Sequence, residues 1–166
     1  RTESSAIELS AVALGTGGYV SNGQAAGDWS GLSVSAAGDM NGDGLADFIV
    51  GASGFSGNAG RSYVVFGKTD SSAINLSAIA DGTGGFVINA QTSTDKSGTS
   101  VSSAGDVNGD GLADLVVGAP GGINSPGRSY VVFGKSSTNA IELSALAHGS
   151  GGFVINGQAA TENSGI

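Results

Sequence analysis

The sequence predicts an all-β protein, and three observations support that class: a glycine-rich composition, short apolar segments bounded by turn residues, and a long internal repeat. Glycine occupies 31 of the 166 positions, and charged residues make up only 12%. Such a composition suits many short strands joined by tight turns. The apolar segments, such as residues 48–50 and 63–66, are far below the roughly 20 residues that a membrane-spanning helix needs. We therefore expect no membrane span.

The charge balance favours cations over anionic partners. Fourteen acidic residues stand against six basic ones, which gives a formal net charge of -8 and an isoelectric point near 4.2. The Lys and Arg residues are scattered, so no basic stripe is available to neutralise phosphates, and nucleic acid is not an expected partner. The chain has no cysteine, which excludes disulfides and thiolate metal sites. Metal ligands must therefore be oxygen atoms.

The internal repeat has a period of 67 residues. Residues 61–68 return as residues 128–135, and alignment of residues 2–68 with 69–135 gives 45 identities in 67 positions. A third copy starts at Ser136 and runs to Ile166, so the chain holds about two and a half units. Repeats of this length are typical of architectures in which similar units stack on one another.

Four strands are expected in each unit, and their side chains indicate how the unit packs. The pattern predicts strands at 85–89, 99–105, 113–119 and 128–134. Residues 115–117 and 130–133 place apolar side chains on both faces, so both faces must be buried. The side chains of residues 100–104 are small, which suits a strand at the narrow, crowded edge of a wedge-shaped sheet. The segment 73–79 is left open between a short strand and a turn.

A sheet that is narrow at one edge and buried on both faces describes the blade of a β-propeller. A β-sandwich is the runner-up, although it would leave one face of each sheet in water, and a parallel β-helix uses much shorter repeats. The predicted units are residues 1–29, a partial repeat with an extra outer strand at 17–22; 30–96, the first blade; 97–163, the second blade; and 164–166, the start of another.

An acidic motif carries the sharpest chemical signal. The sequence DMNGDGLAD at residues 39–47 returns as DVNGDGLAD at residues 106–114, with oxygen-bearing side chains at positions 1, 3, 5 and 9. Calcium takes six to eight oxygen ligands, so a loop that folds back on itself must offer alternate side chains and a backbone carbonyl. The first loop offers the side chains of Asp39, Asn41, Asp43 and Asp47, and the carbonyl of Leu45.

The alternative is that Asn-Gly and Asp-Gly simply form tight hairpin turns. Each copy gathers three carboxylates within nine residues and holds no Lys or Arg, an arrangement that costs free energy unless a cation is bound. An EF-hand is excluded, because Val50 and Val117 stand where its bidentate Glu is needed. We therefore expect two Ca²⁺ per chain, which would change the formal charge from -8 to -4.

The chain resembles FG-GAP repeats, the blades of the integrin alpha-subunit propeller. The resemblance rests on the sequence SGLSVS at residues 30–35, the loop at residues 39–47, and the sequences FIVGAS at 48–53 and LVVGAP at 115–120. Ser30 and Ser97 depart from it, since the family prefers Phe before the glycine. The resemblance implies that both loops bind calcium between the innermost strand and the second. It implies ligands in the second loop at Asp106, Asn108, Asp110, Leu112 (carbonyl) and Asp114.

Differences between the two copies of the repeat gather in two loops, which we call the variable loops. The first is residues 25–29, which correspond to 92–96 in the second copy, and the other is residues 55–59, which correspond to 122–126. Successive turns of an antiparallel blade alternate ends, so these variable loops are expected at the end opposite the calcium loops. One interpretation is a ligand-binding face with Trp29, Phe55 and Lys96 as contacts; the other is neutral drift in exposed loops. Arg61 and Arg128 are expected to form ion pairs with Asp28 and Asp95.

The sequence thus favours a calcium-binding β-propeller module for adhesion or for ligand or protein binding, and not an enzyme. A lectin-like, carbohydrate-binding propeller and a purely structural repeat that self-assembles are the alternatives. Calcium sites of extracellular modules have dissociation constants of about 10⁻⁴ to 10⁻³ M, so the expected location is extracellular or at the cell surface. Because propellers close with typically 4 to 8 blades, we expect either a fragment of a longer propeller or a homo-oligomer.

Overall fold

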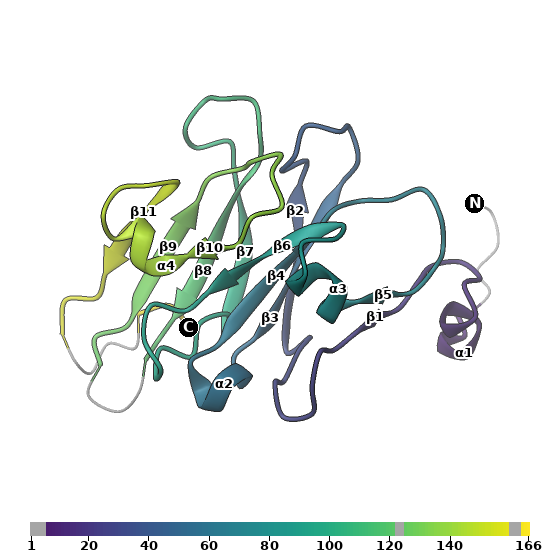
Figure 1. Ribbon diagram of the computed structural model, residues 1–166, viewed down its shortest axis with the longest axis horizontal. Coiled ribbons are helices and arrows are strands. Elements are labelled where there is room, and N and C mark those ends of the chain that lie inside the picture. Colours follow the sequence, from purple (N-terminus) through teal and green to yellow (C-terminus); the bar gives the residue numbers. More distant parts are fainter. Residues whose placement is uncertain (1–5, 122–124, 160–163) are drawn as a thin grey trace.

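The computed structural model describes residues 6–121, 125–159 and 164–166, and its main feature is a pair of four-stranded antiparallel sheets that lie side by side (Figure 1). The predicted propeller blades are therefore confirmed, and the two blades do not close a ring. In the first blade the strand order is β2 (Ser33–Gly38), β3 (Asp47–Ala52), β4 (Arg61–Val65) and β6 (Gly85–Asn89). In the second it is β7 (Ser100–Gly105), β8 (Asp114–Ala119), β9 (Arg128–Val132) and β11 (Gly152–Asn156).

The segment that the sequence left undecided contains both a strand and a helix. Residues 73–79 form β5 (Ile74–Asn75) and then the start of α3 (Leu76–Ala80). The second copy repeats this as β10 (Ile141–Glu142) and α4 (Leu143–Leu146). Strand β10 pairs in parallel with the outer strand β6 of the preceding blade, so the first sheet has a fifth strand. Each repeat therefore covers the outer edge of the blade before it.

The expected extra outer strand is shorter than predicted. Of residues 17–22 only β1 (Ser21–Asn22) is a strand, and it pairs in parallel with β5. This pairing repeats the contact between β6 and β10. The remaining elements are α1 (Leu9–Ala13) near the N-terminus and the short segment α2 (Phe55–Asn58) after β3.

The main hydrophobic core lies between the two blades. The first blade contributes Ile49, Val64, Phe86 and Ile88, and the second contributes Leu115, Val117, Tyr130 and Val132; all eight are 0% exposed. Two leucines of α4 close this core at the outer side. The other face of the first blade is covered by Leu76 and Ile79 of α3. Both faces of the first blade are therefore buried, as the sequence predicted.

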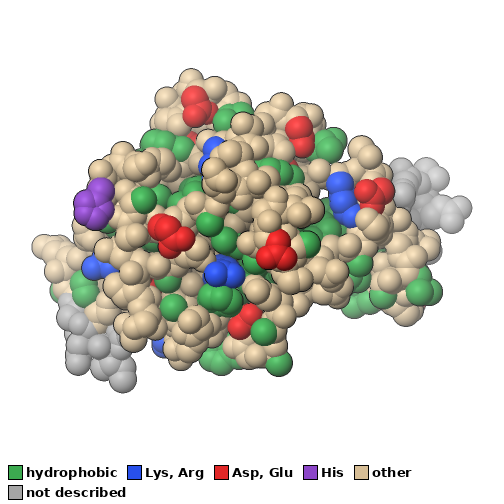
Figure 2. Space-filling model, viewed as in Figure 1, with side chains coloured by type: hydrophobic (Ala, Val, Ile, Leu, Met, Phe, Trp, Pro, Cys, Tyr) green, Lys and Arg blue, Asp and Glu red, His purple; other side chains and the backbone are tan. Residues whose placement is uncertain are grey.

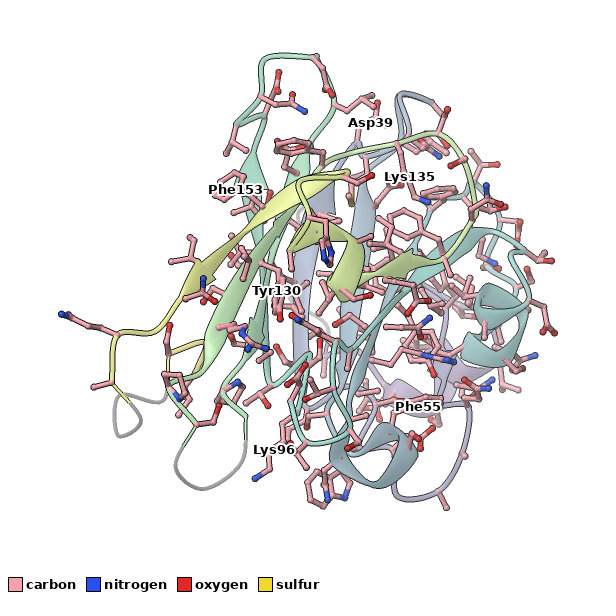
Figure 3. The ribbon with its side chains drawn as sticks, turned by 60° about the vertical axis from the view of Figure 1, so that its left-hand side comes forward. Asp39, Phe55, Lys96, Tyr130, Lys135 and Phe153 are labelled. Atoms are coloured by element: carbon pink, nitrogen blue, oxygen red, sulfur yellow. The ribbon has the colours of Figure 1, made fainter. Side chains whose placement is uncertain are left out.

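One face of the second blade has no such cover. Phe153 and Ile155 on β11 are 44% and 50% exposed, whereas their counterparts Phe86 and Ile88 in the first blade are fully buried. Figure 3 places Phe153 at the outer edge of the molecule and Tyr130 between the sheets. The same side chains are core residues in one blade and surface residues in the other, because only the first blade has a following neighbour in this structure.

Glycines set how closely the blades approach. A Cβ on Gly51 would lie 2.1 Å from the carbonyl oxygen of Gly98, and a Cβ on Gly118 would lie 2.0 Å from that of Gly165. Within each blade, the glycine before the innermost strand donates its N–H to the carbonyl oxygen of a glycine in the second strand. These bonds join Gly31 to Gly51 at 3.1 Å and Gly98 to Gly118 at 2.9 Å, and we call these four residues the motif glycines. The motif glycines therefore hold the start of each inner strand against the neighbouring blade.

No helix among the described residues is long and apolar enough to cross a membrane.

Candidate metal centre and the opposite loops

The two acidic loops are the hairpin connections from the innermost strand of each blade to the second. Residues 39–46 join β2 to β3, and residues 106–113 join β7 to β8. Both loops lie at the same end of the molecule, at the top of Figure 1. The backbone N–H of Ala113 donates to the carbonyl of Asp39 at 3.0 Å, so the second loop lies directly against the first.

Within the first loop, the acidic side chains accept hydrogen bonds from the backbone that bends around them. Asp39 Oδ1 accepts from the N–H of Gly42 at 2.7 Å, and Oδ2 accepts from Gly44 at 2.9 Å. Asp43 Oδ1 accepts from the N–H of Leu45 at 2.8 Å. Gly42 and Gly44 have φ angles of +78° and +83°, a region that glycine adopts without strain. The loop therefore winds tightly around its own carboxylates.

The second loop repeats this geometry. Asp106 Oδ1 accepts from Gly109 at 2.7 Å and Oδ2 from Gly111 at 2.9 Å, while Asp110 Oδ1 accepts from Leu112 at 2.9 Å. Each distance agrees with its counterpart in the first loop within 0.1 Å. The asparagines also behave alike, since the Nδ2 atoms of Asn41 and Asn108 donate to Asp43 and Asp110 at 2.9 and 2.8 Å. The motif thus encodes one loop structure in both blades.

The last acidic residue of each loop also ties the loop to the blade. Asp47 is 2% exposed; its Oδ2 accepts from the N–H of Met40 at 2.8 Å, and its Oδ1 accepts from that of Gly67 at 2.7 Å. Asp114 makes the same two bonds with Val107 and Gly134. Burial raises the pKa of Asp47, and the nearby carboxylates of Asp43 and Asp39 raise it further, whereas the two backbone donors lower it. Sequence reasoning missed the bond to Gly67, because nothing in the spacing relates residue 47 to residue 67.

The donor set of these loops fits a hard cation in chemistry. Every proposed ligand is an oxygen atom, and a carboxylate that accepts backbone hydrogen bonds keeps further lone pairs. Among the described residues, no group of three His, Cys, Asp or Glu side chains converges as a metal-binding cluster. The carboxylates instead face the backbone donors of their own loop. Binding of a cation would therefore require Asp43 and Asp110 to share their oxygens between the backbone and the ion.

The predicted ligand-contact residues lie at the opposite end of the blades. Figure 3 places Phe55 and Lys96 at the end away from Asp39. Their loops contact one another: Gly54 donates its N–H to the carbonyl of Asp28, next to Trp29, at 3.1 Å, and Lys96 donates to the carbonyl of Asn58 at 3.0 Å. Trp29 is 59% exposed and, with Leu32, lines a cavity of about 580 Å³. The structure thus brings all three residues to one end.

The predicted ion pairs of Arg61 and Arg128 are wrong. The one ion pair among the described residues joins Lys68 to Asp70. Arg61 donates instead from Nε to Asn89 Oδ1 at 2.8 Å, and its guanidinium lies over the ring of Phe55. The register explains the change, because Arg61 on β4 pairs directly with Asn89 on β6. In the second blade, Arg128 donates to Gln91, and Asp95 accepts from the backbone N–H of Thr92.

The strands, their order and the repeated acidic hairpins define two blades of a β-propeller repeat protein. Comparison with family models identifies the kind of blade: the FG-GAP repeat model matches residues 30–65 and 97–132. These two segments are FG-GAP repeats, as their resemblance indicated. Each match covers the innermost three strands of a blade, with the acidic loop inside it. A search of curated proteins found no match.

Proposed function

We propose that this chain is a calcium-stabilised part of a β-propeller that acts as an extracellular binding or adhesion module. The observation that carries the proposal is the pair of acidic loops, whose hydrogen bonds agree within 0.1 Å although the loops stand in different surroundings. Met40 of the first loop is fully buried, whereas its counterpart Val107 is 50% exposed. Because the loop has the same hydrogen bonds in both surroundings, its conformation is determined by its own sequence and not by the surrounding residues.

Calcium would have a structural role in this proposal. Asp39, Asn41, Asp43, the Leu45 carbonyl and Asp47 would hold one ion, and the equivalent residues of the second loop would hold the other. Three carboxylates within nine residues repel one another, and a bound divalent cation removes that repulsion. Because Asp47 and Asp114 also bond to the glycines that follow the third strands, stabilisation of each loop would extend to its blade.

A calcium titration followed by native mass spectrometry tests the proposal. We expect two Ca²⁺ per chain and a melting temperature that falls when calcium is chelated, since a ligand that binds the folded state alone stabilises it. Magnesium at the same concentration is the control, because its smaller octahedral shell suits such a loop less well. A chain that binds no calcium and melts at the same temperature with and without chelator would contradict the proposal.

The uncovered face of the second blade supports a further part of the proposal, that this face packs on another blade. Phe153 and Ile155 on that face repeat the side chains by which the first blade packs on the second. Either a further blade of a longer chain or a blade of a second copy could cover Phe153 and Ile155 with the same kinds of side chain. Analytical ultracentrifugation tests the second of these: a discrete oligomer supports packing between copies, and a monomer contradicts it.

We also propose that the loops opposite the calcium loops meet the ligand, and we assign no catalytic role. On the face drawn in Figure 2 the Lys and Arg side chains are separated and form no basic patch. This distribution supports a protein or glycan ligand over nucleic acid, which needs a basic surface that follows the phosphates. The wide separation of the variable loops from the acidic loops would leave the ligand free of direct calcium contact.

A further inference from the structure

A polar cavity of about 330 Å³ lies among the variable loops of the first blade. Phe55, Gly60 and Arg61 line one side of it, and the other side is lined by Asn89, at the end of β6, and by Gln91 and Ser93 from the loop that follows. None of the residues that line the cavity is acidic. Its volume falls at the lower end of the range for small-molecule sites, about 300–1,000 Å³.

Arg61 is held in place by three neighbours, of which Phe55 and Asn89 also line the cavity. The guanidinium carbon lies 3.8 Å from the centroid of the Phe55 ring. Nε donates to Asn89 Oδ1 at 2.8 Å, and Nη1 donates to Gln24 Oε1 at 3.3 Å. A guanidinium has five N–H donors, so these two bonds leave donors on Nη1 and Nη2. No carboxylate among the described residues forms an ion pair with it.

The cavity also contains neutral polar groups, on Gln91 and Ser93. Gln91 Oε1 is occupied, because it accepts from the hydroxyl of Tyr130 at 2.7 Å and from Arg128 at 3.4 Å. The amide nitrogen of Gln91 is thereby directed to other acceptors. The exposed hydroxyl of Ser93 can donate or accept. The cavity thus combines a fixed positive charge with neutral groups that suit hydroxyls.

We propose that this cavity binds an acidic sugar residue, with the sugar carboxylate on Arg61 and its hydroxyls on the Gln91 and Ser93 side chains. The inference rests on the proposed role of this end of the molecule in ligand binding. Arginine matches a carboxylate with two parallel hydrogen bonds. An acidic sugar carries its carboxylate and several hydroxyls on one rigid ring, which matches a single cation beside neutral polar groups, so the lining favours a sugar over an acidic peptide.

The two copies of the repeat offer a matched comparison. Glycine stands at position 122, where the first copy has Phe55, so that position offers no aromatic side chain in the second copy. Ser93 likewise corresponds to an alanine at position 160. The residues that the proposed site needs therefore occur together in the first copy only. Because Arg128 holds Gln91 through a hydrogen bond, the control for a lost positive charge is Lys135, which lies at the end of the molecule away from Phe55 (Figure 3).

The test is a titration of the full chain with sodium D-glucuronate, followed by ¹H–¹⁵N chemical shifts at a fixed free calcium concentration. We expect shifts confined to residues 55–61 and 89–93, and weaker binding at high salt. D-Glucose, which lacks the carboxylate, should bind at least about tenfold more weakly. Arg61→Gln and Phe55→Gly should each weaken glucuronate binding by a similar factor, while Lys135→Gln, which removes a positive charge outside the cavity lining, should leave it unchanged.

Several results would overturn the inference. These are the absence of shifts at residues 55–61, equal binding of glucose and glucuronate, equal loss in Arg61→Gln and Lys135→Gln, and tighter binding of an aspartate-containing peptide than of glucuronate. Circular dichroism of each variant checks that a loss of binding is not a loss of fold. The calcium count of the same samples separates the two proposals, because no lining residue belongs to an acidic loop. A chain with two calcium ions and no sugar shifts contradicts this inference alone.

Discussion

At the scale of single residues, the carboxylates of the acidic motif have a structural role and a proposed metal-binding role, and the same side chains serve both. Asp39 and Asp43 shape the loop through backbone hydrogen bonds, and Asp47 joins the loop to Gly67, two residues after the third strand. The same carboxylates are the proposed calcium ligands. A substitution that keeps the hydrogen bond but removes the charge therefore tests the metal separately from the fold.

Asp110→Asn comes nearest to such a substitution, because the amide oxygen can still accept the N–H of Leu112 that Asp110 Oδ1 accepts at 2.9 Å. Only the exposed bond that Oδ2 accepts from Asn108 Nδ2 is lost. We expect the variant to bind one Ca²⁺ in place of two and to melt at a lower temperature than the parent chain in calcium. In chelator the difference in melting temperature should be much smaller, because the variant then lacks only one exposed hydrogen bond, the one from Asn108. Asp81→Asn, an exposed site outside the loops, controls for the change in net charge. Calcium counts by native mass spectrometry check the prediction, and two ions bound to the Asp110 variant would contradict it.

Ser97 illustrates how a departure from the family pattern is accommodated. It stands where the FG-GAP family prefers Phe, and it is 0% exposed with no hydrogen-bond partner for its hydroxyl. A buried polar group without a partner costs about 1–3 kcal/mol. We expect Ser97→Ala to raise the free energy of unfolding by about 1 kcal/mol in urea denaturation. Thr99→Ala is the contrast, because the Thr99 hydroxyl donates to the Lys96 carbonyl at 2.7 Å, and its loss should not stabilise the chain.

At the scale of elements, the contact between consecutive blades depends on backbone approach at the motif glycines. The inner strand of the second blade begins against β3 of the first, where Gly51 meets Gly98. Strand β10 then covers the outer edge of the first blade by pairing with β6. Each blade is thus attached to the next at its inner and its outer edge, and the core between them is closed from both sides.

Gly51→Ala should weaken this contact. The new methyl group would lie 2.1 Å from the carbonyl oxygen of Gly98, a backbone atom that cannot move without displacing β7. We expect the free energy of unfolding to fall by about 3 kcal/mol, the upper end of the usual range for overpacking. Gly18→Ala is the control, since its methyl group would meet only Val12 at 3.4 Å. Equal stabilities of the two variants in urea denaturation would contradict the account of the blade contact.

At the scale of the whole molecule, the two blades have the same strands in different surroundings. The first blade is covered on one face by the second blade and on the other by α3, whereas the second blade leaves Phe153 and Ile155 exposed. An exposed apolar sheet face of this kind indicates a contact with another structural unit. The same side chain should therefore contribute unequally to stability in the two repeats.

Phe86→Ala and Phe153→Ala form the matched pair for this prediction, as they occupy the same position 67 residues apart. Phe86 is 0% exposed, and its truncation should cost about 3–5 kcal/mol. Phe153 is 44% exposed, and its truncation should cost the isolated chain about 1 kcal/mol and weaken any association between copies. Urea denaturation and sedimentation measure the two effects. Equal costs in a monomeric chain would show that the Phe153 face is already covered.

The sequence by itself determined the strands, their order in each blade and the acidic hairpins. Residue spacing suffices there, because alternation of side chains and tight turns at Asn-Gly and Asp-Gly are local properties. The alternation of turns also predicted that the variable loops lie at the end opposite the acidic loops. In the structure the variable loops contact one another through Gly54 and Asp28 and through Lys96 and Asn58, and Figure 3 places Phe55 and Lys96 at the end away from Asp39.

Only the tertiary structure decided the partners of side chains that are distant in sequence. Arg61 bonds to Asn89 and lies on Phe55 because strand register and the α2 turn bring them together, whereas charge alone suggested Asp28. Asp47 bonds to Gly67, and β10 pairs with β6, for the same kind of reason. Local sequence fixes backbone geometry through short-range sterics and hydrogen bonds, but which side chains meet depends on how whole blades pack.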